Sequence, residues 1–278
     1  MTTLDRCRRV PREFDRLARL YARYHTRKSA HEAREFTDWI RLRPHESILD
    51  AACGPGALAR TMAGRGARAF ALDISPRMLE LVCSEHRRRP VFPTLGDVQT
   101  LPYAAGTFDL VACAYAFANF PSPLTILREF ARVTRAEGRI AIIDVVAPEN
   151  PRQRSRLNEV EARRSRLCTH ILSRVQFLRL FEAAGLVVLR SASHRRRQSI
   201  REWLELSPAL THQPAARIRH LLEKSGDCRS TAPHAHRRGS TCSVTHTTEW
   251  FLLCKRPPSA SPSEFSRPSF LCREVNPS

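Results

Sequence analysis

From Ser47 onward the chain alternates short, almost wholly apolar segments with amphipathic ones. The apolar segments fall at residues 47–52, 67–73, 91–97, 108–115 and 138–146. A continuous apolar run indicates a strand buried on both faces, and such strands occur in parallel sheets that helices cover. The pattern therefore predicts an α/β fold built on a doubly wound, mostly parallel sheet.

The pattern of apolar and polar residues also divides the chain into regions. Residues 1–45 predict an N-terminal helical cap, because Phe14, Leu17 and Tyr21 follow helical spacing. Residues 46–257 predict one Rossmann-like domain whose C-terminal strand, near 247–256, is antiparallel. Two charged stretches, about 149–175 and 195–225, predict helical lid insertions. The Pro- and Ser-rich residues 258–278 predict a disordered tail, and residues 226–246 match neither a helix nor a strand pattern.

Charge is the most misleading feature of the composition. The formal net charge is +19, but only three of the 46 basic residues are lysines. Arginines are spread through the expected helices and form no single stripe with interleaved aromatics. We therefore expect weak attraction to polyanions but no specific nucleic-acid partner.

Other features of the sequence argue against a membrane span, a signal peptide and a metal site. No run of about 18 apolar residues predicts a membrane span, and the N-terminus lacks the apolar core of a signal peptide. Nine cysteines are scattered singly, without the spacing of a metal site. We expect a cytoplasmic protein with reduced thiols and no bound metal.

The stretch "SILDAACGPGALA" (47–59) combines a strand, a glycine turn and a helix start. Gly54 and Gly56 let the backbone approach a ligand, and the helix start presents bare N–H groups. Two acids follow the next strands: Asp73, placed to accept both hydroxyls of a ribose, and Asp97, placed near an adenine edge. These positions predict an adenosine site.

Asp50 indicates which adenosine ligand the turn accepts. It ends the first strand, where the pyrophosphate of a dinucleotide would meet its negative charge. S-adenosylmethionine carries no phosphate; its sulfonium and ammonium groups are attracted by a carboxylate, and its own carboxylate suits a helix N-terminus. The stretch therefore favours S-adenosylmethionine over NAD.

In its order of motifs the chain resembles the class I S-adenosylmethionine-dependent methyltransferases, in the small-molecule branch related to ubiquinone/menaquinone-biosynthesis methyltransferases. The resemblance covers roughly residues 10–257 and runs through "ILDAACGPG", "ALDISPRML", "GDVQTLPYAAGTFDLV" and "FPSPLTILREFARVTRAEGRIAIID". It implies methyl transfer from S-adenosylmethionine to a small-molecule acceptor. It also implies a set of cofactor-binding residues: Asp50, Ala52, Gly54, Gly56, Asp73, Ile74, Met78, Asp97, Val98, Ala114 and Tyr115.

The sequence leaves the acceptor chemistry open. His170 is the one candidate catalytic residue, placed near the acceptor by the resemblance, and it equally fits a helix N-terminal histidine. Whether carbon, nitrogen, oxygen or sulfur is methylated stays open, as does the oligomeric state. Two other function classes remain: an NAD-type Rossmann oxidoreductase, and a nucleic-acid-binding or -modifying protein of the methyltransferase fold.

Overall fold

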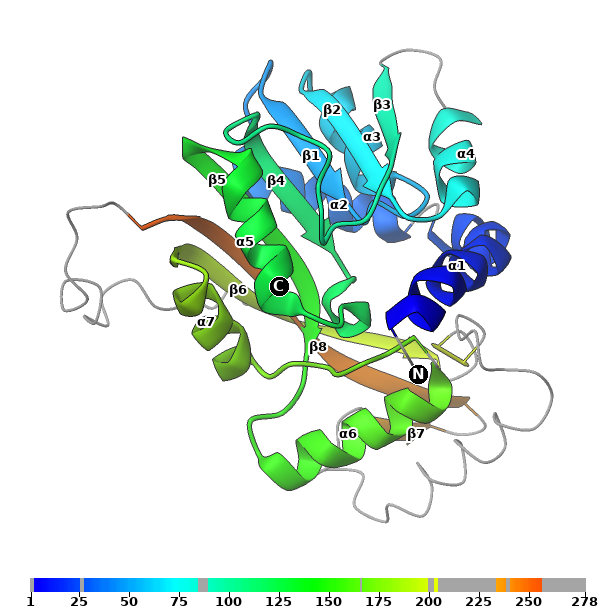
Figure 1. Cartoon of the computed structure of the whole chain (residues 1–278). Helices are drawn as coiled ribbons and strands as arrows, with labels where there is room; N and C mark the ends of the chain where they lie inside the picture. The colour runs from blue at the N-terminus through cyan, green and yellow to red at the C-terminus, as the bar shows by residue number, and fades with distance from the viewer. Residues whose placement is uncertain are drawn as a thin grey trace.

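The computed structural model describes residues 3–25, 28–84, 90–165, 167–199, 203–204, 234–238 and 241–256. Its centre is one mixed sheet with the strand order β3-β2-β1-β4-β5-β8-β6, and β7 pairs with β8. Helices pack on both faces of this sheet (Figure 1). The doubly wound α/β fold predicted from the apolar segments is confirmed.

The helices are α1 (Thr3–His25), α2 (Lys28–Trp39), α3 (Ala57–Gly64), α4 (Pro76–Ser84), α5 (Pro123–Val133), α6 (Pro151–Arg164) and α7 (Arg174–Ala183), with a 3-10 turn at Phe117–Asn119. The strands are β1 (Ser47–Ala51), β2 (Arg68–Asp73), β3 (Val91–Leu95), β4 (Phe108–Ala114), β5 (Thr134–Val146), β6 (Leu186–Ser199), β7 (His234–Arg238) and β8 (Thr241–Lys255).

Strands β1 to β5 run parallel to one another, whereas β8 runs antiparallel to both β5 and β6. One face of the sheet buries an apolar cluster that includes Phe130 of α5 and Phe177 of α7. The other face buries a second cluster that includes Phe36 of α2, Met62 of α3 and Val82 of α4. The apolar strands are thus covered on both faces, as their sequence requires.

The C-terminal part departs from our expectation in two places. Residues 195–199, expected to begin a helical insertion, continue β6 and pair with the first half of β8. Within residues 226–246, for which no pattern was found, 234–238 form β7 and 241–246 begin β8. The expected tail at 258–278 and most of the second insertion lie outside the described residues.

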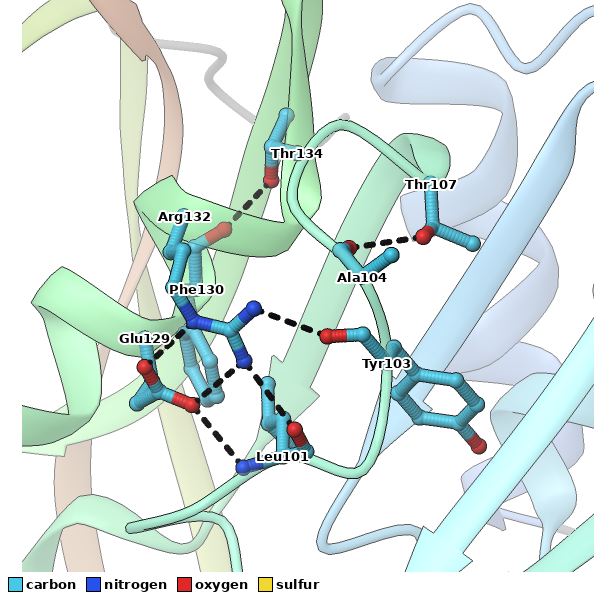
Figure 2. A network of polar contacts seen from close by, with 8 residues as sticks. All are labelled: Leu101, Tyr103, Ala104, Thr107, Glu129, Phe130, Arg132 and Thr134. Carbon is cyan, nitrogen blue, oxygen red and sulfur yellow. Dashed lines mark hydrogen bonds and ion pairs between the residues drawn. The ribbon is translucent and has the colours of Figure 1, made fainter.

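A polar network fixes the loop that follows β3 (Figure 2). The Arg132 guanidinium donates to the carbonyl of Tyr103 (2.8 Å) and to that of Leu101 (3.0 Å). It also donates to both carboxylate oxygens of Glu129. Oε2 of Glu129 accepts a further hydrogen bond from the Leu101 N–H at 2.9 Å. One turn of α5 therefore holds the 101–103 backbone of this loop in place.

Candidate functional site

A cavity of about 490 Å³ lies at the carboxyl ends of β1 to β4. Ten of the eleven predicted cofactor-binding residues line it: Asp50, Ala52, Gly54, Asp73, Ile74, Met78, Asp97, Val98, Ala114 and Tyr115. Carboxyl ends of neighbouring parallel strands meet at one edge of a sheet, so residues up to 65 positions apart in the sequence surround one space. Their roles toward a ligand remain predictions.

The loop from β1 to α3 bends sharply at the cavity. Ala52 and Gly54 both have left-handed backbones, with φ of 57° and 53°. Space is open around the position where a Cβ of Gly54 would lie. Gly56, with φ of 80°, is the predicted residue that does not line the cavity; a Cβ there would lie 2.7 Å from Cγ2 of Val82. Gly56 therefore serves the contact between the loop and α4.

Asp50 is buried, and its Oδ2 accepts a hydrogen bond from the Ala59 N–H at 2.9 Å. Burial raises the pKa of Asp50 to about 7, and the nearby Asp73 adds to the rise, while the Ala59 N–H and the Arg60 charge oppose it. Raised pKa values of this kind mark a carboxylate that a positive ligand would stabilise. Asp50 thus fits the cationic groups of S-adenosylmethionine.

Asp73 ends β2 and uses both carboxylate oxygens. Oδ2 accepts from the Gly54 N–H at 2.8 Å, and Oδ1 accepts from the Ser75 N–H at 2.9 Å. Each oxygen keeps a second lone pair for a ligand hydroxyl. Burial raises the pKa of Asp73, and the backbone N–H groups of Ser75 and Gly54 oppose the rise.

The loop after β3 supplies Asp97 and Val98. Both Asp97 oxygens are engaged by Gln99, Oδ1 by its backbone N–H at 2.9 Å and Oδ2 by its side-chain amide at 3.0 Å. Val98 is buried and lines the cavity. An acid next to an apolar wall can accept a hydrogen bond from the amino group of a purine while the wall packs on its ring.

Apolar walls complete this half of the cavity. Met78 is buried on α4, whose first turn is capped by the Ser75 hydroxyl accepting from the Met78 N–H at 3.2 Å. Tyr115 follows β4 with a left-handed φ of 57°, a conformation that is strained for a bulky residue. Such strain persists where the surrounding contacts hold it, and here it turns the chain at the cavity wall.

Several lining residues were not predicted from the sequence. Val10, Phe14 and Tyr21 come from α1, Glu32 from α2, and residues 119–122 begin at the last residue of the 3-10 turn. The apolar stripe of α1 was visible, but nothing in it indicated whether it faced a core or a cavity.

His170, the candidate catalytic residue, is exposed and is not among the residues that line the cavity. The described residues contain no group of three or more His, Cys, Asp or Glu side chains that could hold a metal ion. Among the described helices, none is both long and apolar enough to cross a membrane.

The charge of the cavity contrasts with that of the chain. Its described lining includes four acids, Glu32, Asp50, Asp73 and Asp97, and none of those lining residues is Lys, Arg or His. The whole chain nevertheless carries 46 Lys and Arg against 27 Asp and Glu. The cavity therefore suits a cationic ligand and opposes a pyrophosphate.

Similarity to known proteins covers the part of the chain that carries most of this cavity's lining. Residues 49–142 match a family model described as a methyltransferase domain. The demethylmenaquinone methyltransferase of Corynebacterium efficiens is 36% identical over 110 residues, 40% of this chain and 46% of that protein. The nocamycin O-methyltransferase of Saccharothrix syringae is 32% identical over 146 residues, 50% of this chain and 52% of that protein. The chain spans about half the length of these relatives.

Among solved structures, the YcgJ protein of Bacillus subtilis superposes with a TM-score of 0.73 at 19% identity. The superposition covers 82% of this chain and 99% of that one, and it extends the shared fold well beyond the matched domain. The expected resemblance to class I methyltransferases is confirmed, and the NAD-type oxidoreductase is not favoured.

Proposed function

Because residues 49–142 match a methyltransferase domain model, we propose that this chain transfers a methyl group from S-adenosylmethionine to a small-molecule acceptor. The observation that carries the proposal is the cavity lined by four acids and by no described basic side chain. In a chain of net charge +19, an acidic cavity at the strand ends selects a cation. The absence of basic partners there also disfavours a dinucleotide.

Each group of predicted residues contacts a different part of the ligand in this proposal. The Asp73 carboxylate accepts hydrogen bonds from the ribose hydroxyls, and Asp97 with Val98 holds the adenine. Ile74 and Met78 pack on the adenosine, and Asp50 faces the positive groups of the methionine part. The loop 52–56 shapes the approach, while Gly56 acts indirectly through its contact with Val82.

S-adenosylmethionine supplies an activated methyl on a positive sulfur, so the protein chiefly aligns the acceptor and excludes water. In this proposal residues 1–45 act as the cap, since Val10, Phe14 and Tyr21 close one side of the cavity. The domain spans 46–257, with α6 in the first lid insertion. The acceptor meets Ala114, Tyr115 and residues 119–122 on the remaining side.

We also propose a cytoplasmic location and no specific nucleic-acid partner. Five cysteines whose side chains the structure describes, Cys53, Cys83, Cys113, Cys168 and Cys254, are free thiols, which fits a reducing compartment. None of the described residues that line the cavity is basic, so the lining offers no cationic side chain for reading a base where the methyl group would be transferred.

Transfer itself is tested with methyl-labelled S-adenosylmethionine and a panel of small acceptors that includes hydroquinones, phenols, amines and thiols. Label recovered in one acceptor class by the wild-type protein, and lost with Asp73→Ala, supports the proposal. Label transferred to RNA or DNA instead, or oxidation of an acceptor with NAD, would contradict it.

A further inference from the structure

Glu32 is the one acid of the cavity to which the proposed adenosyl site gives no role. It lies on α2, and its side chain is 18% exposed. Its Oε1 accepts a hydrogen bond from the Tyr115 hydroxyl at 2.5 Å, and its Oε2 accepts from Arg196 at 2.7 Å. Two donors hold the carboxylate in a single orientation at the cavity wall.

The positive partner of Glu32 sits behind it. Arg196 comes from β6, is not among the residues that line the cavity, and donates to the Tyr115 hydroxyl at 3.0 Å. Its guanidinium carbon lies 5.9 Å from the centre of the Tyr115 ring. The ion pair is therefore oriented, with its negative end at the cavity and its positive end away from it.

The hydroxyl between the two charges keeps its proton. Burial raises the pKa of Tyr115 above its usual range, and the Glu32 charge raises it further, against the lowering effect of Arg196. Tyr115 is consequently a hydrogen-bond donor that orients Glu32, and it does not act as a base.

Strand order shows which part of the ligand Glu32 faces. Asp97 follows β3, Asp73 ends β2 and Asp50 lies on β1, in that order across the sheet. A ligand with its adenine at β3 and its ribose at β2 directs its 5′ substituent toward β1 and β4. Tyr115 directly follows β4, so its partner Glu32 lies toward the sulfur end.

We propose that Glu32, oriented by Tyr115 and Arg196, distinguishes the charged sulfur of S-adenosylmethionine from the neutral sulfur of S-adenosylhomocysteine. This inference rests on the proposed function. Methyl transfer breaks the S–CH₃ bond and leaves its electron pair on sulfur, so the sulfonium becomes a thioether. A carboxylate facing that atom favours the donor over the product, and product release is thereby eased.

The test is the ratio of the two affinities, measured calorimetrically at pH 7.5 for the wild-type protein and for Glu32→Gln and Arg196→Met. Glu32→Gln is expected to lower the preference for S-adenosylmethionine about three- to tenfold. Arg196→Met is expected to raise it, because Glu32 then lacks its compensating charge. Glu35→Gln, which removes an exposed acid from the same helix, is the matched control and keeps the wild-type ratio.

A purely structural role would give a different pattern, because damage to the wall weakens both ligands by the same factor. An unchanged ratio in Glu32→Gln, with both ligands still bound, overturns the inference and leaves the proposed function standing. If Glu32→Gln does not fold, Arg196→Met decides, and an unchanged or lowered ratio overturns the inference. A wild-type protein that binds neither ligand overturns the inference together with the proposed function.

Discussion

The Asp73 carboxylate accepts a hydrogen bond from the Gly54 N–H at 2.8 Å, so that the end of β2 holds the glycine loop that follows β1. The same carboxylate holds the start of α4 through the Ser75 N–H. The Asp73 side chain thereby fixes two segments of the cavity wall. In the proposed function it also accepts hydrogen bonds from the ribose hydroxyls.

Asp73→Ala is therefore expected to weaken binding of S-adenosylhomocysteine at least 10-fold, and about 100-fold if both hydroxyl bonds to the charged group are lost. Calorimetric titration measures the loss. Asp38→Ala, which removes an exposed carboxylate paired with Arg65, is the control and keeps wild-type affinity. Wild-type affinity in Asp73→Ala would refute the ribose assignment.

Asp50 predicts a pH dependence of stability. Its pKa in the folded protein is about 7, against 3.8 for the ordinary group. Because the folded pKa is the higher one, the contribution of Asp50 to the free energy of unfolding is complete below about pH 4 and is lost as the pH rises through 7. Asp144 is buried with a pKa raised to about 7 and adds a loss of the same sign.

Asp50→Asn isolates the contribution of Asp50, since the amide oxygen can still accept from the Ala59 N–H. Relative to the wild type, the variant should gain stability on the order of 2 kcal/mol between pH 5 and pH 8. Urea unfolding at several pH values measures this difference, from which Asp144 and the other shared groups cancel. A difference that stays constant with pH would show that Asp50 is ionised throughout.

Substitution of the two loop glycines, Gly54 and Gly56, should lower the free energy of unfolding by unequal amounts. Gly56→Ala should lower the free energy of unfolding by about 1–3 kcal/mol, because the methyl meets Val82 and the backbone is left-handed. Gly54→Ala lacks the steric contact and should cost about 1 kcal/mol, with the larger effect on ligand affinity. Thermal and urea unfolding compare the two variants.

A double variant identifies the cause. If contact with Val82 is responsible, Val82→Ala will cost less stability in the Gly56→Ala background than in the wild type. Strict additivity of the two costs would leave only the backbone conformation as the reason.

Much of this architecture could be predicted from the sequence. Apolar strands at Ser47–Ala51 and Phe108–Ala114 signal burial on both faces, and Asp50 and Asp73 stand at strand ends, where strand order alone brings them together. These features depend on local patterns and on one rule of parallel sheets, so they did not require knowledge of distant contacts.

The features that could not be predicted from the sequence depend on contacts between segments far apart in the chain. Strand β6 continues to Ser199 because β8 provides a partner along its whole length, although its Arg-rich residues gave no apolar alternation. Thr241, Val244 and Thr245, which precede the strand predicted from residue 247, are β-branched, and they are the signal that could have revealed the start of β8. Glu32 was missed because its place at the cavity depends on Tyr115 and Arg196, which are 83 and 164 residues away.

The loop after β3 predicts a further effect on stability. Arg132→Met removes the donors to the Leu101 and Tyr103 carbonyls (Figure 2) and should cost about 1–2 kcal/mol, because the site is partly exposed to water. Urea unfolding gives the value. Arg128→Met, on an exposed position of the same helix, is the control, and an equal cost for both variants would argue against the network.

We propose that the acidic cavity at the strand ends holds a cationic adenosyl ligand. Calorimetric titration of the wild-type protein with S-adenosylmethionine and with NAD⁺ tests it most directly. We expect saturable 1:1 binding of S-adenosylmethionine with a Kd of roughly micromolar order, about −8 kcal/mol, and no measurable binding of NAD⁺. Tighter binding of NAD⁺ than of S-adenosylmethionine would contradict it.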